Sequence, residues 1–204
     1  MKLHWSPKSP YVRKVMVCAE ELHLLPQLQL VRSVAAMARP NAAIMQDNPL
    51  SKIPTLVLDD GSALFDSAVI CEYLDALAGG SLFPASGPAR WQALRWQAFG
   101  DGLLDALILW RNERERPAAA ISTELMRAFE VKTRAALAQL EKETAALQRA
   151  PFSIGHVTLV CALAYIDFRF SDLGWRTVAP DLAIWYADQK TRPAFAATEP
   201  SAEG

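Results

Sequence analysis

The sequence predicts an α/β unit at the N-terminus, with a mixed four-stranded sheet in the element order βαβ-α-ββα, followed by an all-α helical bundle. Two apolar runs, Lys2–Trp5 and Leu28–Val31, have strand character and flank a helical pattern over Pro10–His23. Parallel strands need a crossover of this kind, so the stretch predicts a right-handed βαβ unit. Beyond a glycine- and proline-rich segment at 79–89, the apolar spacing is helical.

The first helix begins at Ser9-Pro10. Serine is a strong N-cap because its oxygen accepts from free backbone N–H groups, and proline suits the first helical position. A helix that starts directly after a strand also presents unpaired N–H donors and the positive end of a helix dipole. Such a helix start can hold an anion, although a purely structural cap is the more common role for Ser-Pro alone.

Strand, turn and cap signals define the rest of the α/β unit. Residues 35–47 are irregular and predict only a short, poorly defined helix. Asp60-Gly61 is a strong hairpin signal between two short strands, and Asp66 or Ser67 caps the helix that follows. These elements are, in order, a strand at Thr55–Leu58, a strand at Ser62–Phe65 and a helix that ends at about Leu77.

Four helices are predicted in the remainder of the chain, over residues 90–110, 122–148, 154–170 and 181–190. The first two are amphipathic, whereas the third is apolar nearly all round, which suits a buried central helix. We therefore predict an α/β domain at 1–78, a linker at 79–89 and an all-α domain at 90–204.

The 204 residues carry a net charge of −1, with 51% hydrophobic and 21% charged residues. This balance is ordinary for a globular protein and gives no basic face for phosphate backbones, so we expect no nucleic-acid partner. Lys8, Arg13 and Lys14 come too early for a signal peptide, and the longest apolar run, Val157–Ile166, is too short for a membrane span. We expect a cytoplasmic protein without a membrane partner.

Cys18, Cys71 and Cys161 are far apart and form no C-x-x-C pair, which argues against a disulfide framework or a zinc site. Each lies in an apolar helical pattern and is predicted to be a small buried side chain. The histidines show no ligand spacing either, so we expect no metal.

Two further features of the α/β unit point, together with the Ser9 helix start, to a binding site. Ile53-Pro54 stands directly before a strand, where a cis peptide bond would leave the backbone N–H and C=O of Ile53 to an extended ligand. Asp66-Ser67, at another helix start, offers a charged acceptor and a hydroxyl to an amine and a carboxylate. Each feature alone is more often structural, but their coincidence in one small unit predicts a site.

These motifs resemble those of the glutathione S-transferases, in particular bacterial serine-type proteins loosely similar to the omega and zeta classes. The resemblance covers nearly the whole chain and is strongest at Ser9–Lys14, Asn48–Pro54, Phe65–Ser67 and Cys71–Leu74. It implies a thioredoxin-like N-terminal domain that binds glutathione, an all-α domain that forms the pocket for a small hydrophobic electrophile, and a homodimer.

The resemblance also implies roles for individual residues of the first domain. Ser9 would contact the glutathione sulfur, and Ile53, ahead of a cis Pro54, would pair with the cysteinyl backbone. Asp66 and Ser67 would bind the γ-glutamyl end.

Three further roles are transferred less directly. Lys52 or the nearby Arg39 would face the glycyl carboxylate, and the sequence leaves both open. Asp105 ends a D-G-x-x-D segment and would reach across the dimer interface to the partner's glutathione; a solvated helix face explains it equally well. Candidates for the electrophile pocket are Tyr11, Trp96, Phe99 and Arg111.

The stretch Ser9-Pro10-Tyr11-Val12 occupies the position where glutaredoxins carry C-P-Y-C, and both thiols are absent. The chain cannot form a mixed disulfide there, which leaves activation of a bound thiol. Lowering a thiol pKa of about 8.5 by about 2 units needs about 2.7 kcal/mol of thiolate stabilisation. A helix N-terminus supplies about 0.3–1 kcal/mol and a charge-assisted hydrogen bond from Ser9 about 1.5–3 kcal/mol, which together suffice.

The sequence therefore predicts a glutathione transferase that uses glutathione as a co-substrate. The alternatives are a glutathione-dependent isomerase or dehalogenase, and a non-catalytic ligand-carrier or interaction protein of the same fold.

The start of the central helix departs from the family pattern. The family usually has Ser or Thr followed three residues later by Asp, whereas this chain has Ser153 and His156. A histidine cannot return a carboxylate to the cap, so we expect capping weaker by about 0.5–1 kcal/mol and a higher melting temperature for His156→Asp.

Overall fold

A computed structural model describes residues 1–201 and contains a four-stranded mixed sheet in the first part of the chain. Strand β1 pairs in parallel with β2 and antiparallel with β3, and β3 pairs antiparallel with β4, which gives the order β2-β1-β3-β4. The predicted mixed sheet is confirmed. The strands are β1 (Lys2–Trp5), β2 (Gln29–Arg32), β3 (Thr55–Val57) and β4 (Ala63–Leu64).

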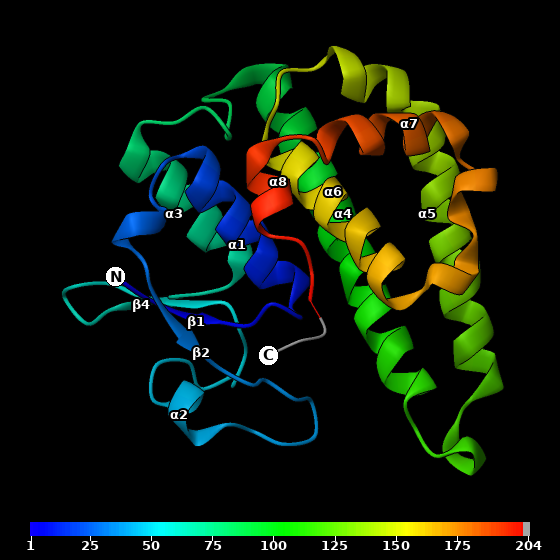
Figure 1. The fold of residues 1–204 in the computed structure, drawn as a ribbon, viewed down its shortest axis with the longest axis horizontal. Coiled ribbons are helices and arrows are strands. Elements are labelled where there is room, and N and C mark those ends of the chain that lie inside the picture. Colours follow the sequence, from blue (N-terminus) through cyan, green and yellow to red (C-terminus); the bar gives the residue numbers. More distant parts are fainter. Residues whose placement is uncertain (202–204) are drawn as a thin grey trace. The chain divides into compact units, whose positions relative to one another are not determined.

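Helices cover both faces of this sheet. Helices α1 (Pro10–Glu21) and α3 (Ser67–Ala78) pack against each other on one side, and the short α2 (Ala42–Met45) lies on the other (Figure 1). Small and β-branched apolar residues make α1 a buried helix, among them the fully buried Val12, Val15, Val17, Cys18 and Ala19. The other two cysteines are also buried, as predicted.

The described chain divides into two compact units. The first unit contains Met1–Trp91 together with the described residues from Pro193 onward, and the second contains Gln92–Arg192. The predicted all-α domain of 90–204 rests on helical spacing alone. The structure groups the described residues from Pro193 onward with the first unit instead.

The short helix α8 (Pro193–Ala197) belongs with the first unit because it packs on α1. Phe195 is fully buried, and Nη2 of Arg13 donates a hydrogen bond to its carbonyl oxygen at 3.1 Å. The Arg13 side chain is only 4% exposed, so a buried guanidinium holds α8 in place.

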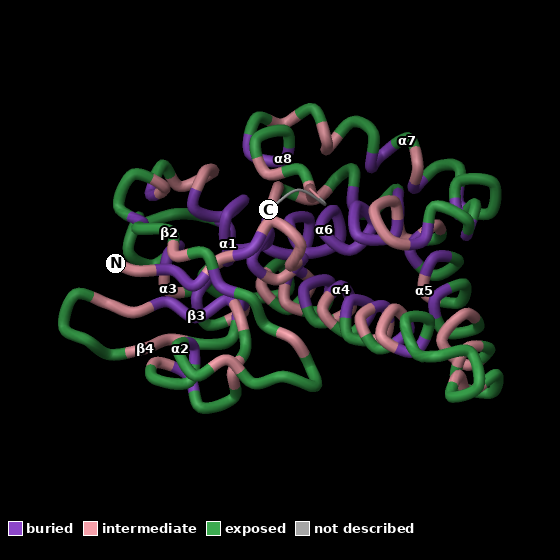
Figure 2. The backbone as a smooth tube through the Cα atoms, turned by 60° about the horizontal axis from the view of Figure 1, so that its bottom comes forward, coloured by how far each residue is buried: buried purple, intermediate pink, exposed green. Residues whose placement is uncertain are grey.

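The second unit is helical, as predicted. Helix α6 is buried nearly all round and is drawn mostly purple in Figure 2. Among the described residues no single helix is long and apolar enough to cross a membrane. One bent pair, α6 with Ser171–Thr177, has the length and composition of a span when taken together. The helices are α4 (Gly87–Arg114), which starts in the first unit, α5 (Thr123–Arg149), α6 (Ile154–Arg169) and α7 (Pro180–Gln189). Short 3-10 turns lie at Leu25–Gln27, Ala118–Ala120, Ser171–Leu173 and Trp175–Thr177.

Helices α4 and α6 approach each other closely at Gly155. A Cβ atom at this position would lie 2.7 Å from the Cβ of Trp96 and 2.9 Å from the carbonyl oxygen of Ala93. Because the Ala93 atom is backbone and cannot swing away, only glycine fits this contact without a shift of one helix.

The start of α6 has no side-chain cap, in line with the expected weak capping, but its histidine has a role that the sequence did not predict. Ser153 occupies the N-cap position, but its side chain accepts from no backbone N–H and instead lies 3.1 Å from Nδ1 of His156. Nε2 of His156 lies 3.0 Å from the carbonyl oxygen of Leu147. The imidazole is 2% exposed, and burial lowers its pKa. His156 is thus a hydrogen-bonded core residue, which reverses the stability expected of His156→Asp.

Candidate functional site

Ser9 lies at the point where the chain leaves β1 and enters α1. Its backbone is extended, Pro10 follows as the first helical residue, and its Oγ accepts from the backbone N–H of Val12 at 3.3 Å. This confirms the predicted N-cap. The cap uses a lone pair of the oxygen, so the hydroxyl proton remains available to an acceptor beside the helix start.

The second predicted feature, Ile53-Pro54, has the cis peptide bond that the family resemblance implies. Pro54 is buried and Ile53 is half-buried, directly before β3 begins at Thr55. Among the hydrogen bonds of the described residues outside helices and strands, none involves the backbone N–H or C=O of Ile53. Both groups therefore suit a ligand that pairs like an added strand.

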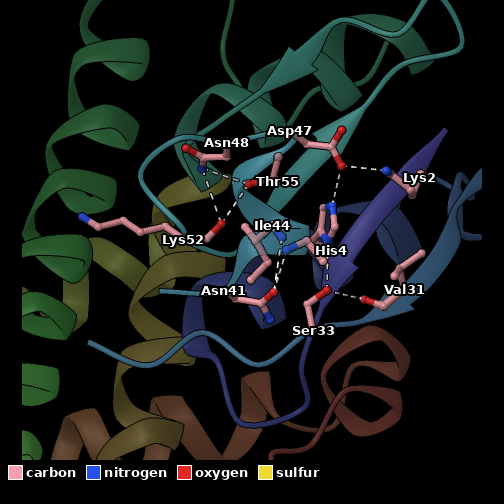
Figure 3. Close-up of polar contacts among 11 residues, drawn as sticks. Lys2, His4, Val31, Ser33, Asn41, Ile44, Asp47, Asn48, Lys52 and Thr55 are labelled. Atoms are coloured by element: carbon pink, nitrogen blue, oxygen red, sulfur yellow. Dashed lines mark hydrogen bonds and ion pairs between the residues drawn. The ribbon is translucent and has the colours of Figure 1, made fainter. Parts of the chain in front are cut away.

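Two side chains for which the sequence predicts no role, Asn48 and Thr55, hold this loop in place. Asn48 is 1% exposed; its Nδ2 donates to Oγ1 of Thr55 at 2.9 Å and its Oδ1 accepts from the N–H of Leu50 at 3.0 Å. The Thr55 hydroxyl in turn donates to the carbonyl oxygen of Lys52 at 2.9 Å (Figure 3). The signal for Asn48 is its place before Pro49, because asparagine side chains often bond the backbone two residues on.

Asp66 and Ser67 form the start of α3. Asp66 is the N-cap, with Oδ1 accepting from the N–H of Ala68 at 2.9 Å, which decides the alternative that the sequence left open. Asp66 is exposed, so its carboxylate can also meet a cationic ligand group, whereas Ser67 is 2% exposed. The Phe65–Asp66 peptide bond is also cis, which the sequence does not signal.

The two candidate cations of the first unit are both exposed. Lys52 extends away from the Asn48–Thr55 contacts in Figure 3, and the backbone of Arg39 pairs with that of Ala36 in an isolated antiparallel bridge. Neither has an ion-pair partner within residues 1–201, so the structure does not choose between them. Tyr11, on the first turn of α1, is half-buried.

The predicted residues of the second unit have different environments. Trp96 is 2% exposed and its Nε1 donates to Oε2 of Glu143 at 2.7 Å, so it is a core residue and does not line an open pocket. Phe99 is half-buried and Asp105 is exposed on α4. Arg111 is half-buried, with Nη2 donating to Oδ1 of Asn112 at 2.7 Å.

The second unit also has a cavity of ≈160 Å³ between the ends of α5 and α7 and the start of α6. None of the predicted pocket residues contributes to it. It is lined by Leu147, Gln148, Ala150, Phe152, His156, Trp185, Asp188, Gln189 and Arg192.

Comparison with known proteins gives consistent matches along the chain. Residues 8–77 match the family model of the glutathione S-transferase N-terminal domain. The Escherichia coli K12 protein described as an uncharacterized GST-like protein, YibF, is 30% identical over 204 residues, and the match covers 98% of both chains.

Two solved structures are similar to this chain over nearly its whole length. A glutathione transferase family member from Pseudomonas fluorescens Pf-5, with bound glutathione, has a TM-score of 0.95 at 43% identity, covering 98% of this chain and 99% of that chain. A glutathione S-transferase from Methylobacillus flagellatus KT, also with glutathione bound, has a TM-score of 0.89 at 32% identity, covering 98% and 99%.

Proposed function

Because the chain belongs to the glutathione S-transferase family, we propose that its first unit binds glutathione and that Ser9 activates the bound thiol for attack on a small apolar electrophile. In this reaction the glutathione thiol releases its proton to solvent, and a lone pair of the thiolate sulfur forms a new bond to the electrophilic carbon. At the same carbon a leaving group departs with its bonding pair or, at an activated double bond, the π pair moves to the neighbouring atom, which takes up a proton from solvent. The relatives from Pseudomonas and Methylobacillus, both solved with bound glutathione, support the binding step.

The hydroxyl of Ser9 is the observation that carries the proposal. It accepts from Val12 N–H at 3.3 Å and keeps its own proton for a thiolate. A charge-assisted hydrogen bond of about 1.5–3 kcal/mol and a helix N-terminus of about 0.3–1 kcal/mol match the roughly 2.7 kcal/mol that a two-unit fall in thiol pKa requires.

The other glutathione contacts are proposed along the same unit. The backbone of Ile53 pairs with the cysteinyl residue, beside the cis Pro54. The exposed Asp66 takes the γ-glutamyl ammonium, and Ser67 takes the neighbouring carboxylate. Lys52 or Arg39 takes the glycyl carboxylate.

The electrophile and the assembly are proposed from the family. Phe99 and Arg111 of the second unit contact the electrophile, and a homodimer places the exposed Asp105 at the partner's glutathione. The function that fits this chemistry is detoxification in the cytoplasm.

Glutathione titration with ultraviolet detection of the thiolate tests the proposal, with wild type compared to Ser9→Ala across a pH series. We expect a thiol pKa about 2 units below 8.5 on the wild type, and a value about 1–2 units higher on Ser9→Ala. S-methylglutathione, which has no thiol, is the matched control ligand and is expected to bind both proteins equally.

Each other outcome has its own meaning. A wild type that does not bind glutathione contradicts the proposal altogether. Binding with an unshifted thiol pKa supports the carrier alternative, and an unchanged Ser9→Ala removes that residue from the mechanism.

A further inference from the structure

His4 links the interior strand β1 to the segment that leads into the proposed glutathione contacts. Its imidazole is 3% exposed, with Nε2 2.7 Å from Oδ2 of Asp47 and Nδ1 2.8 Å from Oγ of Ser33 (Figure 3). Nζ of Lys2 lies 2.6 Å from the same Asp47 oxygen. Hydrogen bonds from His4, and then from Lys2, lower the pKa of Asp47, so this carboxylate is charged at neutral pH.

The residue types Ser33, His4 and Asp47 match a hydrolytic triad, but their geometry does not support hydrolysis. Ser33 is 6% exposed, and its hydroxyl donates to the carbonyl oxygen of Val31 at 3.1 Å. A nucleophilic serine needs a hydroxyl that substrate can reach and a base that takes its proton. Ser33 meets neither condition, so His4 requires another explanation.

The strand register supplies one. His4 lies opposite Thr55 in the β1–β3 pairing, so the two side chains share one face of the sheet. His4 hydrogen-bonds to Asp47, and Thr55 hydrogen-bonds to the next residue, Asn48. The chain is therefore attached to this face at two adjacent points, directly before the turn that leads to Ile53.

We propose that the His4–Asp47 pair is a positioning element of the glutathione site. It fixes the place of Asn48. The Asn48 amide, at 3.4 Å, and the Thr55 hydroxyl, at 2.9 Å, then donate to the Lys52 carbonyl, which belongs to the peptide unit ahead of Ile53. His4 touches no ligand in this role, which rests on the proposed function.

Removing His4 is expected to move the loop more than it unfolds the unit. Asp47 keeps Lys2 as a partner, and β1 keeps its backbone pairing with both neighbouring strands. The effect should therefore appear in the affinity for glutathione, and the bound thiol, which depends on Ser9, should keep its pKa.

Calorimetry with glutathione, together with the pKa of the bound thiol and the melting temperature, tests this role. We expect His4→Leu to weaken glutathione binding about tenfold at an unchanged thiol pKa, by analogy with metal sites, where losing a hydrogen bond that orients a ligand residue costs about 10–100-fold in affinity. Asp47→Asn keeps an acceptor for Nε2–H and is expected to retain most of the affinity. Lys2→Gln leaves the His4–Asp47 contact intact and should bind like wild type.

Asp75→Asn is the matched control for general destabilisation of the same unit. Asp75 is 5% exposed and accepts from the N–H groups of Leu82 and Phe83, away from residues 41–55 in the sequence. We expect it to lower the melting temperature without changing the glutathione affinity. If His4→Leu does not fold, Asp47→Ala breaks the same contact from a side chain that is 20% exposed and should show the same tenfold loss.

The outcomes separate the two proposals. If the wild type binds glutathione and both His4→Leu and Asp47→Ala bind it equally well, the role of His4 is overturned and the proposed function stands. A wild type that binds no glutathione overturns the proposed function and this role with it.

Discussion

Replacing His156 by Asp tests whether the start of α6 depends on its cap or on its core. The substitution restores the family's capping pattern, which is worth about 0.5–1 kcal/mol. It also removes an imidazole that is 2% exposed and lies 5.6 Å, between ring centroids, from both Trp96 and Phe152. The two effects oppose each other, and their sizes decide the sign.

The losses outweigh the gain. The carbonyl of Leu147, now 3.0 Å from Nε2, loses its partner at a cost of about 1–3 kcal/mol, and the lost aromatic contacts cost about 0.5–1.5 kcal/mol. We expect a net destabilisation of about 2 kcal/mol, which lowers the melting temperature by about 4–8 °C for a chain of this size. Thermal unfolding followed by circular dichroism measures it. His156→Asn, which adds no charge, is the control, and a His156→Asp melting temperature at or above wild type refutes this balance.

Three further predictions follow from the structure. Because burial lowers the pKa of His156 below 6.5, the unfolded state takes up its proton first; stability present above about pH 6.5 should fall as the pH drops below it, and melting temperatures at pH 7.5 and 5.5 should differ less in His156→Asn. Gly155→Ala should lower the free energy of unfolding by about 1–3 kcal/mol, whereas Gly102→Ala, with open space around the new Cβ, should raise it by about 0.5–1 kcal/mol in denaturant titrations. Of Lys52→Ala and Arg39→Ala, only the variant that removes the glycyl carboxylate's partner should weaken glutathione binding, by about tenfold in calorimetry; equal binding by both contradicts this contact.

Local signals in the sequence predicted what depends on neighbouring residues. Ser9 caps α1, and the Ile53–Pro54 bond is cis before a strand, because caps and X-Pro turns are set by side chains within a few positions. The central helix α6 also follows directly from its apolar composition. Of these features, the Ser9 cap and the Ile53–Pro54 turn belong to the candidate site.

Features that join distant parts of the chain left no such signal. His4 and Asp47 are 43 residues apart, and neither alternation nor helical spacing reports such a contact. The burial of Trp96 depends on Glu143 and on the close approach at Gly155, so its helical spacing alone could not separate core from pocket. Such contacts are decided by tertiary packing.

The attachment of α8 to α1 affects when the first unit can finish folding during synthesis. The ribosome delivers β1 and α1 first, yet the carbonyl that Arg13 binds belongs to Phe195, 182 residues later. During translation the whole second unit emerges before the first unit is complete. Until then, Arg13 has no Phe195 carbonyl to which it can donate. The first unit therefore reaches its final packing only after the second has been made.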